Sequence, residues 1–209
     1  MTHTIAVVDY GSGNLHSVSR AITRVGASPV VTRDADEIAG ADALVIPGVG
    51  HFGACMRAIR GLGMHSAIED FRATGRPVFG VCVGMQVLFE TGLEHGVRTE
   101  GCGEWPGVVE RLTAPVLPHM GWNTVRPAPG SLLFDGVEGE RFYFVHSYAV
   151  RQWQLPEAEH LPAAQVTWAD HGEPFVAAVE NGPLSATQFH PEKSGDAGAA
   201  LLRNWVRNL

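Results

Sequence analysis

The sequence predicts an α/β fold in which a mostly parallel β-sheet carries helices on both faces and is extended by an antiparallel flank. In the first half, short apolar runs alternate with stretches of helical periodicity, as in a parallel sheet covered by helices. After about Gly96, the strand-like runs follow one another and glycine, proline and aromatic residues increase, which favours antiparallel pairing. Because no repeat or linker interrupts the chain, residues 1–209 are predicted to form one domain.

The first half contains four short runs that predict strands. These are Ile5–Asp9, Pro29–Thr32, Ala43–Ile46 and Pro77–Val81, and the last two are the ones expected to be buried. The predicted helices are a stretch that ends at Val25, followed by Asp34–Ala39, Phe52–Arg60, Met64–Thr74 and Met85–Glu90. Gly26 and Gly75 stand where helices end, because glycine accepts the left-handed conformation of a helix C-terminus.

The second half is predicted to consist mainly of strands. They are Gly107–Leu112, Asn123–Arg126, Arg141–Val150, Phe175–Glu180 and Leu184–Phe189. Asn181-Gly182 separates the last two, and this dipeptide is the strongest short signal for a β-hairpin. A final helix, Ala197–Asn208, is predicted to begin after Asp196 as its N-cap. Its apolar stripe is expected to bury Leu201, Leu202, Trp205 and Leu209.

The composition narrows the class of function. A net charge of −7 argues against nucleic acid, which selects for basic surfaces. The N-terminal apolar run is too short to span a bilayer. Three scattered cysteines form no disulfide framework, which fits the cytoplasm. His51 and Cys55 are too few to hold zinc, and no His-x-x-x-His or Cys-x-x-Cys is present, so no metal or cofactor is predicted.

Cys82 lies in Phe79-Gly-Val-Cys-Val-Gly84, between an apolar strand and a helical pattern. A nucleophile between two such glycines is typical of the sharp strand-to-helix turn of hydrolases, here with sulfur in place of oxygen. The helix N-terminus would favour the thiolate, and the Val83 N–H would point at a developing oxyanion. A buried structural thiol is an equally weighted alternative for this turn alone. Cys55 and Cys102 lack the context and are predicted to be structural.

A cysteine nucleophile needs a base, and His190 follows a strand-like run in Phe189-His-Pro-Glu192. In extended chain, residues two apart face the same side, so Glu192 is expected to reach the imidazole and orient it. The alternative for His190 alone is a hydrogen-bonded packing residue. Together with the cysteine turn at the end of another strand, the catalytic interpretation is favoured.

The loop Pro47-Gly-Val-Gly50 follows a predicted strand, and its glycines would let a peptide N–H point into a cleft as a second oxyanion donor. An ordinary strand-to-helix turn is the alternative. Neither this loop nor Gly11-Ser-Gly13 matches a full dinucleotide-binding or Walker motif, so a phosphate site is disfavoured.

Gly-Val-Cys82-Val-Gly-Met-Gln86 followed by His190-Pro-Glu192 resembles the class I (triad) glutamine amidotransferases, which have a flavodoxin-like sheet. Five further motifs, in order over nearly the whole chain, resemble the glutaminase subunits of imidazole glycerol phosphate synthase. They are Asp9-Tyr-Gly-Ser-Gly-Asn14-Leu, Pro47-Gly-Val-Gly-His-Phe52, His119-Met-Gly-Trp-Asn123, Tyr143-Phe-Val-His-Ser-Tyr148 and Thr187-Gln-Phe-His-Pro-Glu-Lys-Ser194. The departures are mild: Val83 where leucine is commoner, and Ala186 where glycine is frequent.

The resemblance implies a role for several residues. Cys82 attacks the glutamine amide, His190 protonates the departing ammonia and Glu192 completes the triad, while the amides of Val49 and Val83 hold the oxyanion. The implied substrate-binding residues are Gly50, Gln86, Glu94, Ser147 and Tyr148. The implied partner-facing residues are Asn14, Met120, Gly121, Trp122, Tyr143 and Lys193. The implied partner is a (β/α)₈-barrel cyclase that forms a heterodimer with this chain and uses the ammonia in histidine biosynthesis, making imidazole glycerol phosphate and an aminoimidazole carboxamide ribotide.

Several alternatives stay open at this level. Glu94 could be a solvated charge at a helix end, and Trp122 and Tyr143 could be core aromatics. The chain could serve another synthase, such as anthranilate, aminodeoxychorismate or pyridoxal phosphate synthase. It could also be a small cysteine hydrolase or peptidase of similar fold, or an inactive regulatory module, although the intact Cys-His-Glu set disfavours the last.

Overall fold

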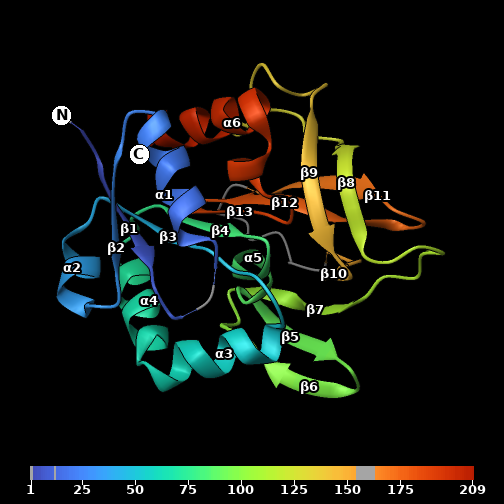
Figure 1. Cartoon of the computed structure of the whole chain (residues 1–209), viewed down its shortest axis with the longest axis horizontal. Coiled ribbons are helices and arrows are strands. Elements are labelled where there is room, and N and C mark those ends of the chain that lie inside the picture. The colour runs from blue at the N-terminus through green and yellow to red at the C-terminus, as the bar shows by residue number, and fades with distance from the viewer. Residues whose placement is uncertain (1, 12, 154–162) are drawn as a thin grey trace.

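The computed structural model describes residues 2–11, 13–153 and 163–209, so Ser12 of the glycine-rich motif lies outside the described residues. Its largest sheet has seven strands in the order β11-β12-β13-β4-β3-β1-β2 (Figure 1). In chain order, these are β1 (Thr4–Val8), β2 (Ser28–Thr32), β3 (Ala43–Ile46), β4 (Val78–Val81), β11 (Gln165–Asp170), β12 (Pro174–Asn181) and β13 (Leu184–Thr187).

The strand directions confirm the predicted fold class. From β2 to β13 each strand is parallel to its neighbour, whereas β11, β12 and β13 pair antiparallel. Every residue of β3 and β4 is buried, as expected of central strands covered on both faces. The β12–β13 hairpin turns at Asn181-Gly182, where Gly182 has φ +59°. The sheet therefore combines a parallel body with an antiparallel flank.

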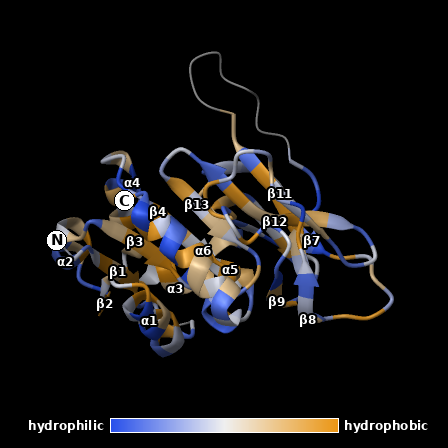
Figure 2. Cartoon of the chain, turned by 90° about the horizontal axis from the view of Figure 1, so that it is seen from above, coloured by the Kyte–Doolittle hydropathy of each residue, from blue (hydrophilic) through white to orange (hydrophobic). Residues whose placement is uncertain are grey.

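Helices cover the two faces of the parallel body (Figure 1). On one face, α1 (Leu15–Arg24) packs against α6 (Gly195–Arg207). On the other face lie α2 (Ala35–Gly40), α3 (Phe52–Gly61) and α4 (Met64–Ala73). Figure 2 shows that the strands of the parallel body are coloured largely as hydrophobic. Trp205 of α6 packs on Phe79 of β4, with ring centroids 5.1 Å apart, so the last helix is anchored to the central strand.

The helix predicted over Met85–Glu90 is wrong. Only one turn of helix, α5 (Val83–Gln86), follows Cys82, and the chain then enters β5 (Phe89–Glu94). This strand is the centre of a second sheet of order β10-β7-β5-β6, whose other strands are β6 (Val97–Glu100), β7 (Trp105–Arg111) and β10 (Tyr148–Val150). Phe89 packs on Trp105 at 5.2 Å, so pairing with a distant strand overrides the local helical pattern.

One predicted strand is displaced, one is divided in two, and three strands were missed. The strand expected at Asn123–Arg126 is β8 (His119–Thr124), which pairs antiparallel with β9 (Arg141–His146). The single run expected over Arg141–Val150 breaks at Ser147, because β9 pairs with β8 whereas β10 pairs with β7. Strands β5, β6 and β11 have no counterpart among the predicted strands.

The predicted N-cap of the last helix is also wrong. Helix α6 begins at Gly195, with Ser194 at the cap position and Asp196 inside the first turn. Asp196 is paired there with Arg24 of α1 at 2.5 Å, so a contact between helices replaces the cap. Leu201, Leu202 and Trp205 are buried as predicted, whereas Leu209 is only partly covered. None of the described helices has the length and hydrophobicity that a membrane span requires.

Candidate functional site

Cys82 stands at the sharp turn between β4 and α5 and is 3% exposed. Its backbone is strained, with φ 55° and ψ −111°, a conformation that side chains other than glycine rarely adopt. The two neighbouring glycines are required by close packing. A Cβ on Gly84 would lie 1.8 Å from the carbonyl oxygen of Ile46, and one on Gly80 would lie 2.8 Å from the oxygen of Gly84. The turn thus has the geometry that its glycine spacing predicts.

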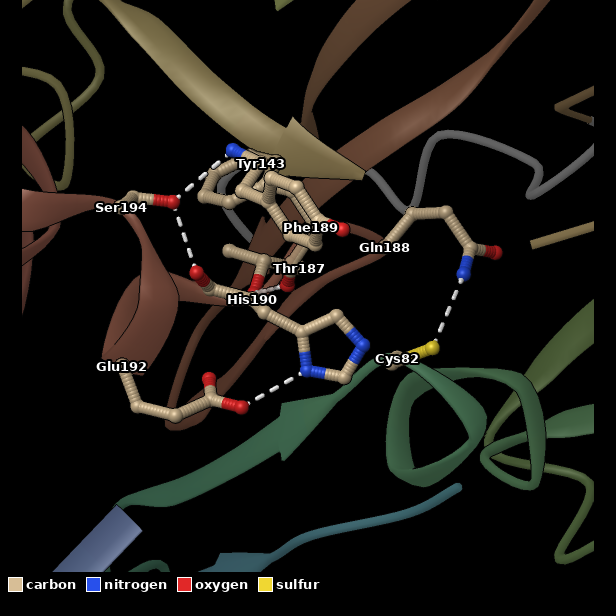
Figure 3. Close-up of polar contacts among 8 residues, drawn as sticks. All are labelled: Cys82, Tyr143, Thr187, Gln188, Phe189, His190, Glu192 and Ser194. Carbon is tan, nitrogen blue, oxygen red and sulfur yellow. Dashed lines mark hydrogen bonds and ion pairs between the residues drawn. The ribbon is translucent and has the colours of Figure 1, made fainter. Parts of the chain in front are cut away.

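His190 and Glu192 follow β13, the strand beside β4 in the sheet (Figure 3). The His190 Nδ1 and Glu192 Oε1 atoms are 2.7 Å apart, and both side chains are 2% exposed. The predicted extended conformation is wrong, because Pro191–Lys193 forms a turn of 3₁₀-helix. Proline suits the first position of a helix, which explains the turn. The carboxylate still reaches the imidazole, and the Ser194 hydroxyl closes the turn by donating to the His190 carbonyl at 2.7 Å.

The surroundings of His190 favour its charged form. Burial lowers the pKa of His190, but the interactions with Cys82 and with Glu192 raise it by more than burial lowers it. The resulting pKa is about 9. The imidazole is therefore protonated at neutral pH. Since Glu192 occupies Nδ1, the other ring nitrogen is left for the Cys82 sulfur, which lies beside the ring in Figure 3. The sulfur, the imidazole and the carboxylate thus lie together as a triad, in which the hydrogen bond from His190 to Glu192 orients the ring.

Two buried glutamines lie near the same sulfur, and one of them, Gln188, was missed at the level of sequence. The Gln188 Nε2 atom donates to Cys82 Sγ at 3.6 Å (Figure 3). The Gln86 Nε2 atom donates to Gln188 Oε1 at 3.0 Å and to the Tyr148 carbonyl at 2.9 Å. The signal was present: Gln188 is two residues before His190 in a strand-like run, so the alternation that was applied to Glu192 also applies to Gln188.

A cavity of about 280 Å³ opens beside Cys82 and His190. The two predicted oxyanion residues and all five predicted substrate-binding residues line it. They are Val49 and Val83, and Gly50, Gln86, Glu94, Ser147 and Tyr148. Glu94 is not at a helix end: it is the last residue of β5, its side chain is 11% exposed, and it lies 3.9 Å from His51 Nδ1. A nearly buried carboxylate at the cavity wall offers a place for a cationic group of a ligand.

The Pro47–Gly50 loop packs directly on the cysteine turn. A Cβ on Gly48 would lie 2.3 Å from the Gly84 nitrogen, so close approach of the two backbones requires glycine there. Gly50 has φ +91° and open space around it. The Tyr10 hydroxyl donates to the Pro47 carbonyl oxygen. Tyr10 of the N-terminal motif thus fixes the position of this loop through a hydrogen bond.

The predicted partner-facing residues lie on neighbouring elements. Met120 and Trp122 of β8 are 62% and 48% exposed, so Trp122 is not a core residue. Strands β8 and β9 form a two-stranded ribbon, in which Trp122 faces Tyr143 of β9. Gly121 lies between Met120 and Trp122 along β8. Asn14 is the N-cap of α1, which packs against the 3₁₀ turn that carries Lys193. The Tyr143 carbonyl accepts from the His190 backbone N–H at 2.9 Å, which ties the ribbon to the triad.

The other cysteines are inert by environment. Burial raises the pKa of Cys102 to about 12, with Glu104 nearby adding to the effect, so it stays a thiol. Cys55 is buried and donates to the Val49 carbonyl at 3.5 Å. Within residues 2–11, 13–153 and 163–209, no group of three histidine, cysteine or acidic side chains is arranged to hold a metal ion.

Comparison with known proteins agrees with this geometry. The family profile "Glutamine amidotransferase class-I" matches residues 6–209. The imidazole glycerol phosphate synthase subunit HisH of Nocardia farcinica is 63% identical over 99% of this chain and 98% of that protein. The HisH subunit of Corynebacterium efficiens is 59% identical over the full length of both. The chain belongs to the HisH family of class-I glutamine amidotransferases.

Solved structures of low sequence identity share the fold of this chain. A crystal structure of a glutamine amidotransferase superimposes with a TM-score of 0.73 at 19% identity, covering 98% of this HisH-family chain and 99% of the other. A chain of the Thermotoga maritima PurLQS structure superimposes with a TM-score of 0.66 at 16% identity, covering 100% and 99%. At such identities the likeness concerns the fold alone.

Proposed function

We propose that this chain hydrolyses glutamine to glutamate and ammonia through Cys82, His190 and Glu192, and supplies the ammonia to imidazole glycerol phosphate synthase. One observation carries the proposal. A strained cysteine and a protonated histidine meet at the wall of a cavity of about 280 Å³, and a buried carboxylate pairs with that histidine. The names of the HisH relatives, which are subunits of that synthase, specify the acceptor reaction.

The chemistry follows from the charges. The Cys82 thiolate attacks the side-chain carbonyl carbon of glutamine, and the oxygen becomes an oxyanion held by the Val49 and Val83 amides. The His190 imidazolium gives its proton to the amide nitrogen, so the C–N bond breaks and ammonia leaves a thioester on sulfur. The neutral imidazole then takes a proton from water, which attacks the thioester and releases glutamate and the thiolate. Glu192 holds the ring in place and stabilises its charged form.

Recognition of glutamine is assigned to the other residues of the cavity. The Glu94 carboxylate pairs with the substrate's α-ammonium group, because it is the acidic side chain on the cavity wall. Gln86 has both amide hydrogens engaged, which leaves its side-chain oxygen for the substrate. Gly50 and the Ser147–Tyr148 backbone close the remaining sides.

The partner is proposed to be the (β/α)₈-barrel cyclase, seated on the face formed by Asn14, Met120, Gly121, Trp122, Tyr143 and Lys193. Exposed apolar side chains support this placement, since Met120 and Trp122 project from a ribbon whose backbone reaches His190. Lys193 and Val145 of the same region line the cavity rim, so ammonia released at Cys82 lies close to this face. The cytoplasm is the proposed location, supported by three free cysteines.

The test is ammonia release from glutamine by the isolated chain, by its complex with the co-expressed cyclase, and by the complex with cyclase substrate. We expect little glutamine turnover by the isolated chain. In the full complex the rate should rise by about 10²–10³, because the partner is proposed to turn the Val49 N–H toward the oxyanion and so add the second donor. Cys82→Ala is expected to abolish release while the partner still binds, and an electrophilic glutamine analogue should label Cys82 alone.

Each competing function has its own outcome in these assays. Hydrolysis of peptides without turnover of glutamine would identify a cysteine peptidase. Co-purification with a different synthase would reassign the acceptor while leaving the triad chemistry intact. Equal turnover in all three states would remove the proposed control by the partner, and labelling of Cys55 or Cys102 would overturn the choice of nucleophile.

A further inference from the structure

We propose that Gln188 is a catalytic residue of this site: its side-chain amide donates a hydrogen bond to the Cys82 sulfur and holds it as the thiolate in the attacking orientation. The proposal deepens the proposed glutaminase function and rests on Cys82 being the nucleophile. The contact that carries it is direct, with Gln188 Nε2 3.6 Å from Cys82 Sγ (Figure 3). That separation suits an N–H donor and a sulfur acceptor, since sulfur is larger than oxygen.

The direction of this hydrogen bond is determined by its neighbours. A backbone carbonyl only accepts, so the atom of Gln86 that contacts the Tyr148 oxygen at 2.9 Å is its nitrogen. That nitrogen also contacts the side chain of Gln188 at 3.0 Å, which requires the oxygen of Gln188 at that end. The Gln188 nitrogen therefore faces the sulfur. The chain of donors runs from one carbonyl to the nucleophile without an ambiguous step.

Burial makes the arrangement costly to reverse. Gln188 is 1% exposed and Gln86 is 3% exposed, so their amides find no bulk water as a substitute partner. Turning the Gln188 amide over would place its oxygen against the sulfur and its NH₂ against the NH₂ of Gln86. Each unmatched buried polar group would destabilise that arrangement. The observed orientation is thus the stable one, and it presents a donor to Cys82.

The chemistry needs such a donor twice. In the resting enzyme, an N–H directed at sulfur favours the thiolate, which is the form that attacks the amide carbon. In thioester hydrolysis, the sulfur leaves with its electron pair and becomes a thiolate again, so the same N–H stabilises the departing charge. His190 is occupied by proton transfer in both halves, whereas the Gln188 amide keeps its protons throughout.

The experiment measures alkylation of Cys82 by iodoacetamide in the full chain between pH 5.5 and 9, with mass spectrometry to confirm the labelled cysteine. Gln188→Met removes the donor at similar size. We expect its alkylation rate at pH 7 to fall about tenfold, because a hydrogen bond to a charged group stabilises that charged form. At high pH the rate should return to the wild-type plateau, since the thiolate itself is unchanged. A purely structural role would not move the profile along the pH axis.

Two further variants separate the alternatives. Gln188→Glu keeps the shape of the side chain but sets a carboxylate against the sulfur, so it should shift the profile the same way even if the methionine variant folds poorly. Gln165→Met, on β11 where its side chain contacts the Gly130 carbonyl, is the matched control and should superimpose on the wild type. A wild-type profile in a folded Gln188 variant overturns the proposal. Because the assay contains no glutamine, it is independent of whether the chain is a glutaminase.

Discussion

Two sets of buried histidines in this molecule have opposite charge states. His190, beside Cys82, has a pKa raised to about 9. On the β8–β9 ribbon, burial lowers the pKa of His119 to about 4, with His171 adding to the effect, and burial together with His119 lowers the pKa of His146 to about 3. All three side chains are less than 10% exposed, so burial alone does not explain the difference. Their partners do: a carboxylate and the Cys82 sulfur flank His190, whereas the pair faces other histidines, whose charge lowers its pKa values further.

The hydrogen bonds of the ribbon pair require neutral rings. The His146 Nδ1 atom donates to the Tyr148 carbonyl at 3.0 Å, so its other nitrogen must accept from His119 Nδ1, also at 3.0 Å. The His119 Nε2 atom in turn accepts from the Asn123 amide at 3.2 Å. Each ring donates once and accepts once, and a proton added to either one leaves two donors face to face. The partner of a histidine, and not its degree of burial, therefore decides whether that histidine is protonated or neutral in this molecule.

The largest expected effect comes from replacing His190, the protonated histidine. His190→Ala removes the proton donor and is expected to reduce glutamine hydrolysis by the complex by about 10³–10⁴. His65→Ala, at a site on α4 where the ring pairs with Glu69, is the control and should retain full turnover. The measurement is steady-state ammonia release at pH 7. Loss of less than tenfold would show that His190 is not the proton donor.

A smaller effect is expected when only the partner of His190 is neutralised. Glu192→Gln keeps a hydrogen-bonding group but removes the charge that favours imidazolium, and a decrease of about 10–100-fold is expected. Because Glu192 raises the pKa of His190, its removal lowers that pKa. The protonated form is then lost at lower pH, so the alkaline limb of the pH–rate profile should move toward neutrality. A profile that stays in place would contradict the assigned role of the carboxylate.

The smallest expected effect concerns stability in acid. The pKa values of His119 and His146 are depressed in the folded chain, so below about pH 6.5 the unfolded chain binds protons that the folded chain does not. Stability should therefore fall from about pH 6.5 toward pH 4, by up to ~1.4 kcal/mol per pH unit for each histidine. His119→Gln should make the slope shallower by up to one proton in urea unfolding at several pH values. Parallel curves for the two proteins would show that His119 is not held neutral.

The fold could be predicted furthest where short-range rules dominate. Fully apolar runs such as Ala43–Ile46 were located correctly because a central parallel strand is buried on both faces, whatever its neighbours are. The Asn181-Gly182 hairpin was located because its conformation is intrinsic to the dipeptide. The helix expected at Met85–Glu90 failed because the partner of that segment, Trp105–Arg111, lies elsewhere in the chain and carries no mark that identifies it.

The candidate site also has features that the sequence predicts and features that it does not. The sequence by itself determined the sharp turn at Cys82 and the spacing of His190 and Glu192, because glycine placement and near neighbours impose them sterically. Only the tertiary structure decided that Gln188 donates to Cys82 and that Gln86 directs it, since these contacts join residues about a hundred positions apart. The charges of His190 and His146 were also decided there. A protonation state depends on the dielectric and the partners at a point in space, and these are set by which distant segments meet in the folded chain.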